Sequence, residues 1–89
     1  MPKITFTQQL SRFTEVPEVE AGAGSLRELM EAAFAVNPRL RDYVLDEQGH
    51  LRKHVTVFVD GLRVREHVRL DQALSAGSKV YVLQALSGG

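Results

Sequence analysis

Cysteine is absent from the 89-residue sequence, and so is any excess of charge of one sign. Without cysteine, the chain has no disulfide framework, no cysteine-type zinc site and no thiol nucleophile. Eleven lysines and arginines balance eleven aspartates and glutamates. This balance argues against nucleic acid or an anionic membrane surface as the main partner, and solvated surface charge is the simplest interpretation of the local groups of arginines.

Long apolar runs are also missing, since no stretch approaches the roughly 20 residues that span a bilayer. Residues 1–5 enter an alternating pattern directly, without the basic segment and apolar run of a signal peptide. We therefore expect a soluble, cytoplasmic protein with no membrane partner. A chain of 89 residues is enough for one domain and too short for two.

The first half of the chain predicts two strands followed by a helix. Residues 3–10 alternate between apolar and polar side chains, which is the period of a half-buried strand, and residues 16–21 predict an edge strand interrupted near Pro17. Ser25 and Glu28 have the spacing of a capping box at a helix start. The apolar stripe of this predicted helix consists of Leu26, Leu29, Met30, Ala33 and Phe34. Asn37-Pro38 ends the helix, and residues 38–45 predict a further short helical turn.

The second half predicts a hairpin and a final strand. Val55, Val57 and Val59 alternate up to Asp60-Gly61, the strongest short hairpin signal, because a type I′ turn needs two residues that tolerate positive φ. The returning strand is expected from Leu62 to about Val68. Leu62 and Val64 are expected to point inward, and Arg63 and Arg65 outward. Residues 70–74 predict one helical turn, and residues 80–85 the last strand.

This order favours an α+β fold, the ubiquitin-like β-grasp, with a mixed sheet of four to five strands and one main helix packed across it. The ferredoxin-like alternative fits less well, because it places a helix directly after the first strand. We expect residues 1–86 to form the domain and residues 87–89 a flexible tail.

The chain ends in Gly88-Gly89 directly after an apolar strand. Glycine has no Cβ, so an extended tail of glycines can enter a narrow channel. Residues 85–89 reach roughly 16 to 18 Å when extended, enough to carry a carboxylate into a partner's active site. That carboxylate is ionised at neutral pH, so it is able to attack the α-phosphate of ATP, and the resulting acyl-adenylate is able to accept sulfur. A frayed terminus or an expression scar is the alternative interpretation.

Four segments together resemble the MoaD/ThiS family of ubiquitin-like sulfur carriers. They are the capped helix, residues 54–61, residues 74–80 and the terminal Leu86-Ser87-Gly88-Gly89. The resemblance implies that a ThiF/MoeB-like enzyme uses ATP to adenylate Gly89, that sulfide or a persulfide supplies the sulfur, and that a biosynthetic enzyme accepts it. It implies no bound cofactor.

Two departures from the family pattern are present. Many members have proline in the last strand and alanine before the glycines, where this chain has Gln84 and Ser87. The stretch from Gly49 to Gly61 looks closer to the CysO-type carriers of cysteine synthesis. The alternatives are a ubiquitin-like modifier or interaction module, and the small subunit of molybdopterin synthase.

A docking surface is predicted on the sheet. If the valines of both long strands point inward, then Phe58, Tyr81 and Leu83 lie on the face opposite the helix, where they would suit docking to an activating enzyme. The alternative is that one or two of them belong to the core. Arg63 and Arg65 are candidates to reinforce docking by charge, against the simpler interpretation of ordinary surface arginines.

Chemistry carried out by the chain alone is not expected. His50 and His54 have helical i, i+4 spacing, but they sit across a turn and a strand start, so that spacing does not bring them together. With His67, they are expected to be ordinary surface histidines. Glu15, Glu18 and Glu20 resemble solubilising charge on an edge segment more than paired catalytic carboxylates. No nucleophile, base and orienting group can be combined. We therefore expect a protein cosubstrate without a metal site, and not an enzyme.

Overall fold

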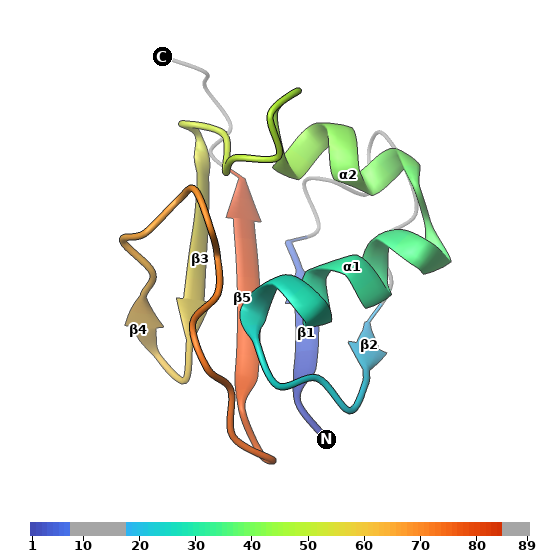
Figure 1. Ribbon diagram of the computed structural model, residues 1–89, viewed down its shortest axis with the longest axis vertical. Helices are drawn as coiled ribbons and strands as arrows, with labels where there is room; N and C mark the ends of the chain where they lie inside the picture. The colour runs from blue at the N-terminus through green and yellow to red at the C-terminus, as the bar shows by residue number, and fades with distance from the viewer. Residues whose placement is uncertain (8–17, 85–89) are drawn as a thin grey trace.

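A five-stranded mixed sheet carries two helices on one of its faces in the computed structural model (Figure 1). The structure describes residues 1–7 and 18–84. The strand order is β2-β1-β5-β3-β4, with β1 and β5 parallel and the other neighbouring pairs antiparallel. The strands are β1 (Lys3–Phe6), β2 (Val19–Glu20), β3 (Val55–Val59), β4 (Leu62–Arg63) and β5 (Lys79–Gln84). This is the α+β arrangement that the sequence predicts.

Helix α1 (Leu26–Val36) begins at the predicted capping box and ends at Asn37. The Ser25 Oγ accepts the Glu28 N–H at 3.3 Å, which satisfies one of the free donors of the first helical turn. All five residues of the predicted apolar stripe are buried. The helix therefore packs its one apolar face on the sheet, as expected from its period.

Helix α2 (Arg39–Val44) follows Pro38 and confirms the predicted helical turn. Its Leu40 and Val44 are completely buried. The chain then turns at residues 46–50, where Gly49 has a φ of 79°. Neither α1 nor α2, the helices of the described residues, is long and apolar enough to cross a membrane.

The two long strands bury alternate residues. In β3 the three valines are buried, and in β5 Val80 and Val82 are buried, while Tyr81 and Leu83 are exposed. The turn between β3 and β4 has φ values of 51° at Asp60 and 85° at Gly61, so the predicted turn with two positive φ values is confirmed. The expected extensions of the first two strands over residues 8–10 and 16–17 lie outside the described residues.

The helical turn predicted at residues 70–74 is wrong. Leu70 has a φ of 55°, a left-handed conformation that a right-handed helix excludes. The segment contains no helical turn, and its carbonyls accept N–H groups from the start of α1: Leu26 donates to Gln72 at 2.9 Å and Arg27 to Leu70 at 2.8 Å. Because the first N–H groups of a helix have no partner inside it, this segment serves as a second cap for α1.

The predicted strand from Leu62 to Val68 is wrong in length. Leu62 pairs with the buried Val59 and so lies on the helix-side face, as expected, but it is not buried. Strand β4 contains only Leu62 and Arg63, and Leu62 is 75% exposed. Helix α1 packs over β1 and β2, toward the opposite edge of the sheet, so it does not cover Leu62. Val64 does point inward, as expected, with 4% exposure. Beyond it the chain leaves the sheet as the loop of residues 64–70, hereafter the 64–70 loop.

Candidate functional site

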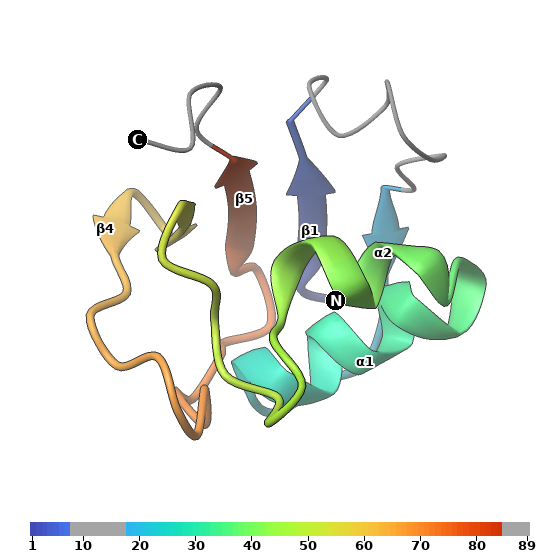
Figure 2. The same cartoon turned by 90° about the horizontal axis from the view of Figure 1, so that it is seen from above.

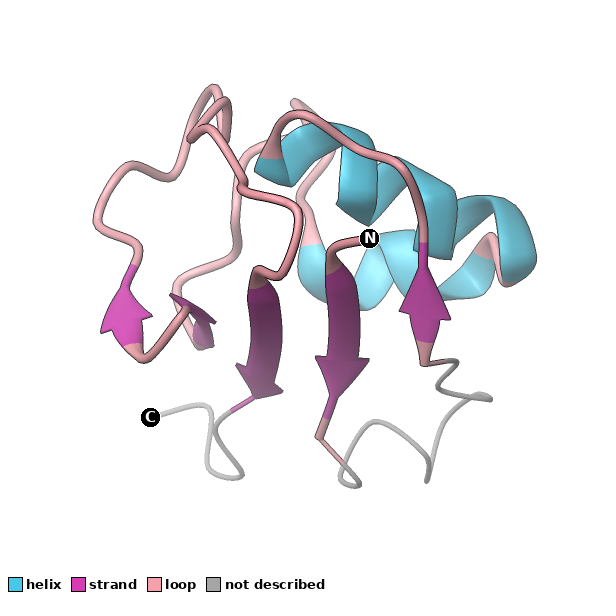
Figure 3. Ribbon diagram, turned by 90° about the horizontal axis from the view of Figure 1, so that it is seen from below, coloured by secondary structure: helices cyan, strands magenta, loops and turns pink. Residues whose placement is uncertain are grey.

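The face of the sheet opposite the helices carries the residues that the sequence singled out. Both helices lie on one side of the sheet in two further views (Figures 2 and 3). On the other side, cross-strand pairing aligns side chains from neighbouring strands: Phe58 of β3 pairs with Arg63 of β4 and with Tyr81 of β5. Tyr81 in turn pairs with Thr5 of β1. These four side chains form one row across four strands, because directly paired residues lie on the same face.

Three apolar side chains form the centre of this surface, which we call the apolar face: Phe58, Tyr81 and Leu83. Tyr81 is 49% exposed and Leu83 37%, while Phe58 is half-buried. With Thr7 and Gly61 at its margins, the apolar face lines a groove of about 310 Å³. The inward assignment of the valines is therefore confirmed, and the alternative that these residues belong to the core is wrong. Their role in docking stays a prediction.

Arg63 and Arg65 are exposed beside the apolar face, at the β4 edge. Together with His67 they line a second hollow of about 320 Å³. Within residues 1–7 and 18–84, neither arginine forms an ion pair. Among the described residues, both positive charges are thus unpaired. Their docking role likewise stays a prediction.

The tail residues Leu86, Ser87, Gly88 and Gly89 lie outside the described residues, as does the boundary predicted after residue 86. The structure does fix the point from which the chain continues toward them. Gln84, the last residue of β5, pairs with Val55, the first residue of β3. The tail therefore follows from the end of the sheet opposite the Asp60-Gly61 turn.

The position of β5 depends on Asp60, which the sequence identified only as a turn residue. One carboxylate oxygen of Asp60 accepts the Lys79 N–H at 2.9 Å, and the other accepts the Ser78 hydroxyl at 3.0 Å. Ser78 is the one buried polar residue among those described. These bonds join the hairpin turn to the start of β5, so they hold Phe58 and Tyr81 in register. The partners are 18 and 19 residues away, which is why no local pattern indicated them.

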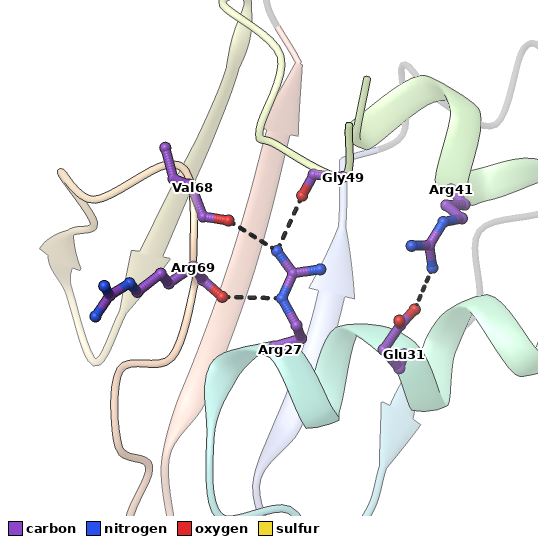
Figure 4. Close-up of polar contacts among 6 residues, drawn as sticks. All are labelled: Arg27, Glu31, Arg41, Gly49, Val68 and Arg69. Carbon is purple, nitrogen blue, oxygen red and sulfur yellow. Dashed lines mark hydrogen bonds and ion pairs between the residues drawn. The ribbon is translucent and has the colours of Figure 1, made fainter. Parts of the chain in front are cut away.

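Arg27 was also missed by the sequence, and it holds the 64–70 loop against α1 (Figure 4). Its guanidinium donates to the carbonyl oxygens of Arg69 at 2.8 Å, Gly49 at 2.9 Å and Val68 at 3.0 Å. An arginine fork is suited to this task because it offers several donors in a fixed plane. Figure 4 also shows the ion pair of Arg41 with Glu31, through which α2 contacts α1.

Glu66 stabilises the same 64–70 loop through hydrogen bonds within it. Its carboxylate accepts backbone N–H groups from Val68 at 2.7 Å, Arg69 at 2.6 Å and Leu70 at 2.5 Å. These bonds, with that of Arg69 the largest contribution, lower the pKa of Glu66 below its ordinary value. Although Glu66 lies between arginines in the sequence, its carboxylate is bound to its own loop and does not pair with Arg63 or Arg65.

The opposite edge of the sheet carries the reverse charge. Glu18 and Glu20 are exposed beside β1, where the Lys3 ammonium lies 3.0 Å from a carboxylate oxygen of Glu18. The hydrogen bond and the charge of Glu18 raise the pKa of Lys3. Within the part of the chain that the structure describes, no group of three acidic, histidine or cysteine side chains could hold a metal ion.

Comparison with known proteins gives one family match and several structural matches. The model of the ThiS family matches residues 4–89. SAMP1 from Haloferax volcanii is 21% identical, with a TM-score of 0.76 over 99% of this chain and 98% of that one. SAMP1 from Methanosarcina acetivorans is 18% identical, with a TM-score of 0.76 over 99% and 95% of the two chains.

A third match is a chain of the BexX/CysO complex from Amycolatopsis orientalis, which is 21% identical with a TM-score of 0.74 over 100% of both chains. No curated protein sequence matches the chain. At these identities the structural matches show a shared fold, and that fold is the ubiquitin-like β-grasp expected from the order of strands and helices.

Proposed function

The chain belongs to the ThiS family of ubiquitin-like sulfur carriers, and on this premise we propose that it carries sulfur as a thiocarboxylate on Gly89. In this proposal the protein is a cosubstrate on which partner enzymes act in the cytoplasm, where ATP is available. The family match to residues 4–89 is the observation that carries the proposal, because it extends over the Gly88-Gly89 terminus.

The chemistry requires only the terminal carboxylate from this chain. A carboxylate oxygen attacks the α-phosphorus of ATP, and the bond to the β-phosphate breaks as pyrophosphate leaves. Sulfide then attacks the carbonyl carbon of the acyl-adenylate, and AMP leaves with the bonding electrons of its C–O bond, so that a thiocarboxylate and a proton are formed. Phosphate binding and metal come from a ThiF/MoeB-like activating enzyme, and ATP is its substrate.

The folded domain supports this role by presenting a surface next to the origin of the tail. Tyr81 and Leu83 of the apolar face belong to β5, the strand that leads into the tail. Apolar side chains exposed together are typical of protein interaction sites. We propose that the apolar face, with Arg63 and Arg65 beside it, docks on the activating enzyme while the tail enters the active site.

A solved relative gives this proposal a precedent for complex formation. The CysO chain from Amycolatopsis orientalis was crystallised in a complex with BexX. By analogy, we propose that a sulfur-accepting biosynthetic enzyme is the second partner of this chain. The acceptor belongs to molybdopterin, thiazole or cysteine synthesis, and the genes beside this one distinguish these three pathways.

Intact-mass measurement after incubation with the ThiF/MoeB-like enzyme of the same organism, ATP and sulfide tests the proposal. We expect the exchange of one oxygen for sulfur at the C-terminus. Deletion of Gly89 should abolish the exchange and leave the thermal midpoint unchanged, because the last residues of a domain generally contribute little to stability. Gly22→Ala is the matched control, since a methyl group there contacts no heavy atom within 4 Å, and this variant should react normally.

Three other results would contradict the sulfur-carrier proposal. Isopeptide conjugates to lysines of other proteins, without the sulfur exchange, would identify a protein modifier. Constitutive association with a large catalytic subunit would identify the small subunit of molybdopterin synthase. Absence of both sulfur exchange and conjugates would leave a binding domain.

A further inference from the structure

The row across the sheet has opposite charges at its two ends. Strands β1 and β2 are antiparallel with Ile4 paired to Val19, so the next position along brings Thr5 beside Glu18. The Thr5 hydroxyl donates to a carboxylate oxygen of Glu18 at 3.5 Å. The complete row is therefore Arg63, Phe58, Tyr81, Thr5 and Glu18. It begins with a cation, passes over two aromatic rings and ends with an anion.

The two ends are far enough apart to be recognised separately. They are separated by four strand spacings, or roughly 19 Å at about 4.8 Å per spacing. This exceeds twice the Debye length of about 8 Å at physiological ionic strength. At the cationic end, Arg63 and Arg65 have no acidic partner within the described residues, since Glu66 binds its own backbone. At the anionic end, the Lys3 ammonium pairs with Glu18, and Glu20, which lies opposite Lys3 in the strand register, forms no ion pair within the described residues.

The row runs across the strands, whereas the tail follows from the end of one strand. Apolar contact has no direction, so the apolar face alone would accept a partner in either of two orientations related by half a turn. In one of them the Gln84 end of β5 points toward the partner's active site, and in the other it points away from it. A charge polarity that runs across the strands distinguishes the two orientations, because half a turn exchanges the cationic end with the anionic end.

We propose that this charge polarity fixes the orientation in which the activating enzyme docks. The inference rests on the proposed function and adds the chemistry of the partner surface: an apolar patch, an acidic strip facing Arg63 and Arg65, and a basic group facing Glu18 and Glu20. Like charges in apposition suppress the reversed orientation. A protein surface fits better than a nucleic acid, because a phosphate backbone lying along the row would meet the two glutamates.

Kinetics of ATP–pyrophosphate exchange with the ThiF/MoeB-like enzyme test the polarity. The double variant R63E/R65E should raise KM for the carrier about tenfold at low salt and leave kcat unchanged, because the tail and its carboxylate are intact. The double variant E18K/E20K should also raise the KM for the carrier. Added salt should raise the KM of the natural sequence, because it screens the charges. The difference in KM between the natural sequence and each double variant should therefore become smaller. R39E is the matched control, since Arg39 is exposed on α2 at the helical side, and its KM should be unchanged.

The outcomes separate this inference from the proposed function. If the natural sequence supports no exchange, the proposed function fails. If it supports exchange and the KM of R63E/R65E equals that of R39E, only the polarity inference is overturned. Binding of a single-stranded RNA oligonucleotide that is lost in R63E/R65E, with KM unaffected, would also overturn it in favour of nucleic acid. Circular dichroism melting of each variant confirms that the fold is retained.

Discussion

The conformation of the 64–70 loop is set by two side chains of opposite charge. Arg27 donates to the carbonyls of Val68 and Arg69, and Glu66 accepts the N–H groups of residues 68–70. Together they provide partners for backbone groups that no sheet ladder satisfies, and an unpaired polar group removed from water is costly. The loop in turn buries Leu70 and caps α1. Single residues thus stabilise a connection without regular secondary structure.

Glu66 makes stability depend on pH in a direction that its hydrogen bonds determine. Its pKa is lowered in the folded state from the ordinary 4.5, so its contribution to the free energy of unfolding is fully present above pH 4.5. The contribution is lost as the pH falls through the lower folded pKa. Glu66→Gln should therefore reduce the free energy of unfolding at neutral pH and flatten its decline in acid. Urea unfolding above and below pH 4.5 measures both effects.

Glu47→Gln is the control, because Glu47 is exposed and its carboxylate takes part in none of the hydrogen bonds of the described residues. That variant should keep the stability and the pH profile of the natural protein. Identical profiles for Glu66→Gln and the natural protein would show that the three N–H bonds do not stabilise the loop.

Among the elements, the β3–β4 hairpin depends on the conformation of one glycine. Gly61 has a φ of 85° and open space around it. Gly61→Ala should therefore lower the free energy of unfolding by about 1 kcal/mol through backbone strain alone. Gly77→Ala provides the comparison, since its surroundings are equally open and its φ is not positive. Chemical denaturation should show a loss for Gly61→Ala and none for Gly77→Ala, and equal losses would refute the strain argument.

How far an element could be predicted depended on whether its determinants are close in sequence. Helix α1 was predicted because Ser25 and Glu28 are three residues apart, and the hairpin because Asp60 and Gly61 are adjacent. The segment at residues 70–74 was mistaken for a helix because its partners are the N–H groups of Leu26 and Arg27, more than forty residues earlier. Its apolar spacing contained no information about that pairing.

The candidate site was likewise predictable only where its determinants are local in sequence. A period of two residues placed Phe58, Tyr81 and Leu83 on the open face of the sheet. Glu18 was interpreted as solubilising charge, because its alignment with Arg63 depends on the register of five strands. Sequence periodicity thus identifies the face of a residue, while the order of strands determines which residues share a row.

At the scale of the whole molecule, the two faces of the sheet serve different purposes. Val82 is completely buried under the helices, and its neighbour Tyr81 is 49% exposed on the other side. Val82→Ala should lower the free energy of unfolding by roughly 2 kcal/mol, because it removes buried methyl groups and leaves a cavity. Tyr81→Ser should cost less than about 1 kcal/mol, the range for one cross-strand pair.

The activity of these two variants should follow the opposite order. At a temperature where both are folded, Tyr81→Ser should raise KM for activation, and Val82→Ala should retain the natural value. Denaturation curves and exchange kinetics on the same preparations check both halves of the expectation. A Tyr81→Ser variant with natural KM would mean that the open face does not take part in docking.

The central place of β5 between β1 and β3 has a consequence for biosynthesis. The first strand and the last described strand are direct neighbours, so the ribosome must synthesise almost the entire domain before the sheet can close. A product of premature termination lacks the strand that joins the two halves of the sheet, so we expect it to stay unfolded and open to proteases. Closure of the sheet would then serve as a check that synthesis has proceeded through β5, and we expect that truncated chains do not accumulate as folded decoys for partner enzymes.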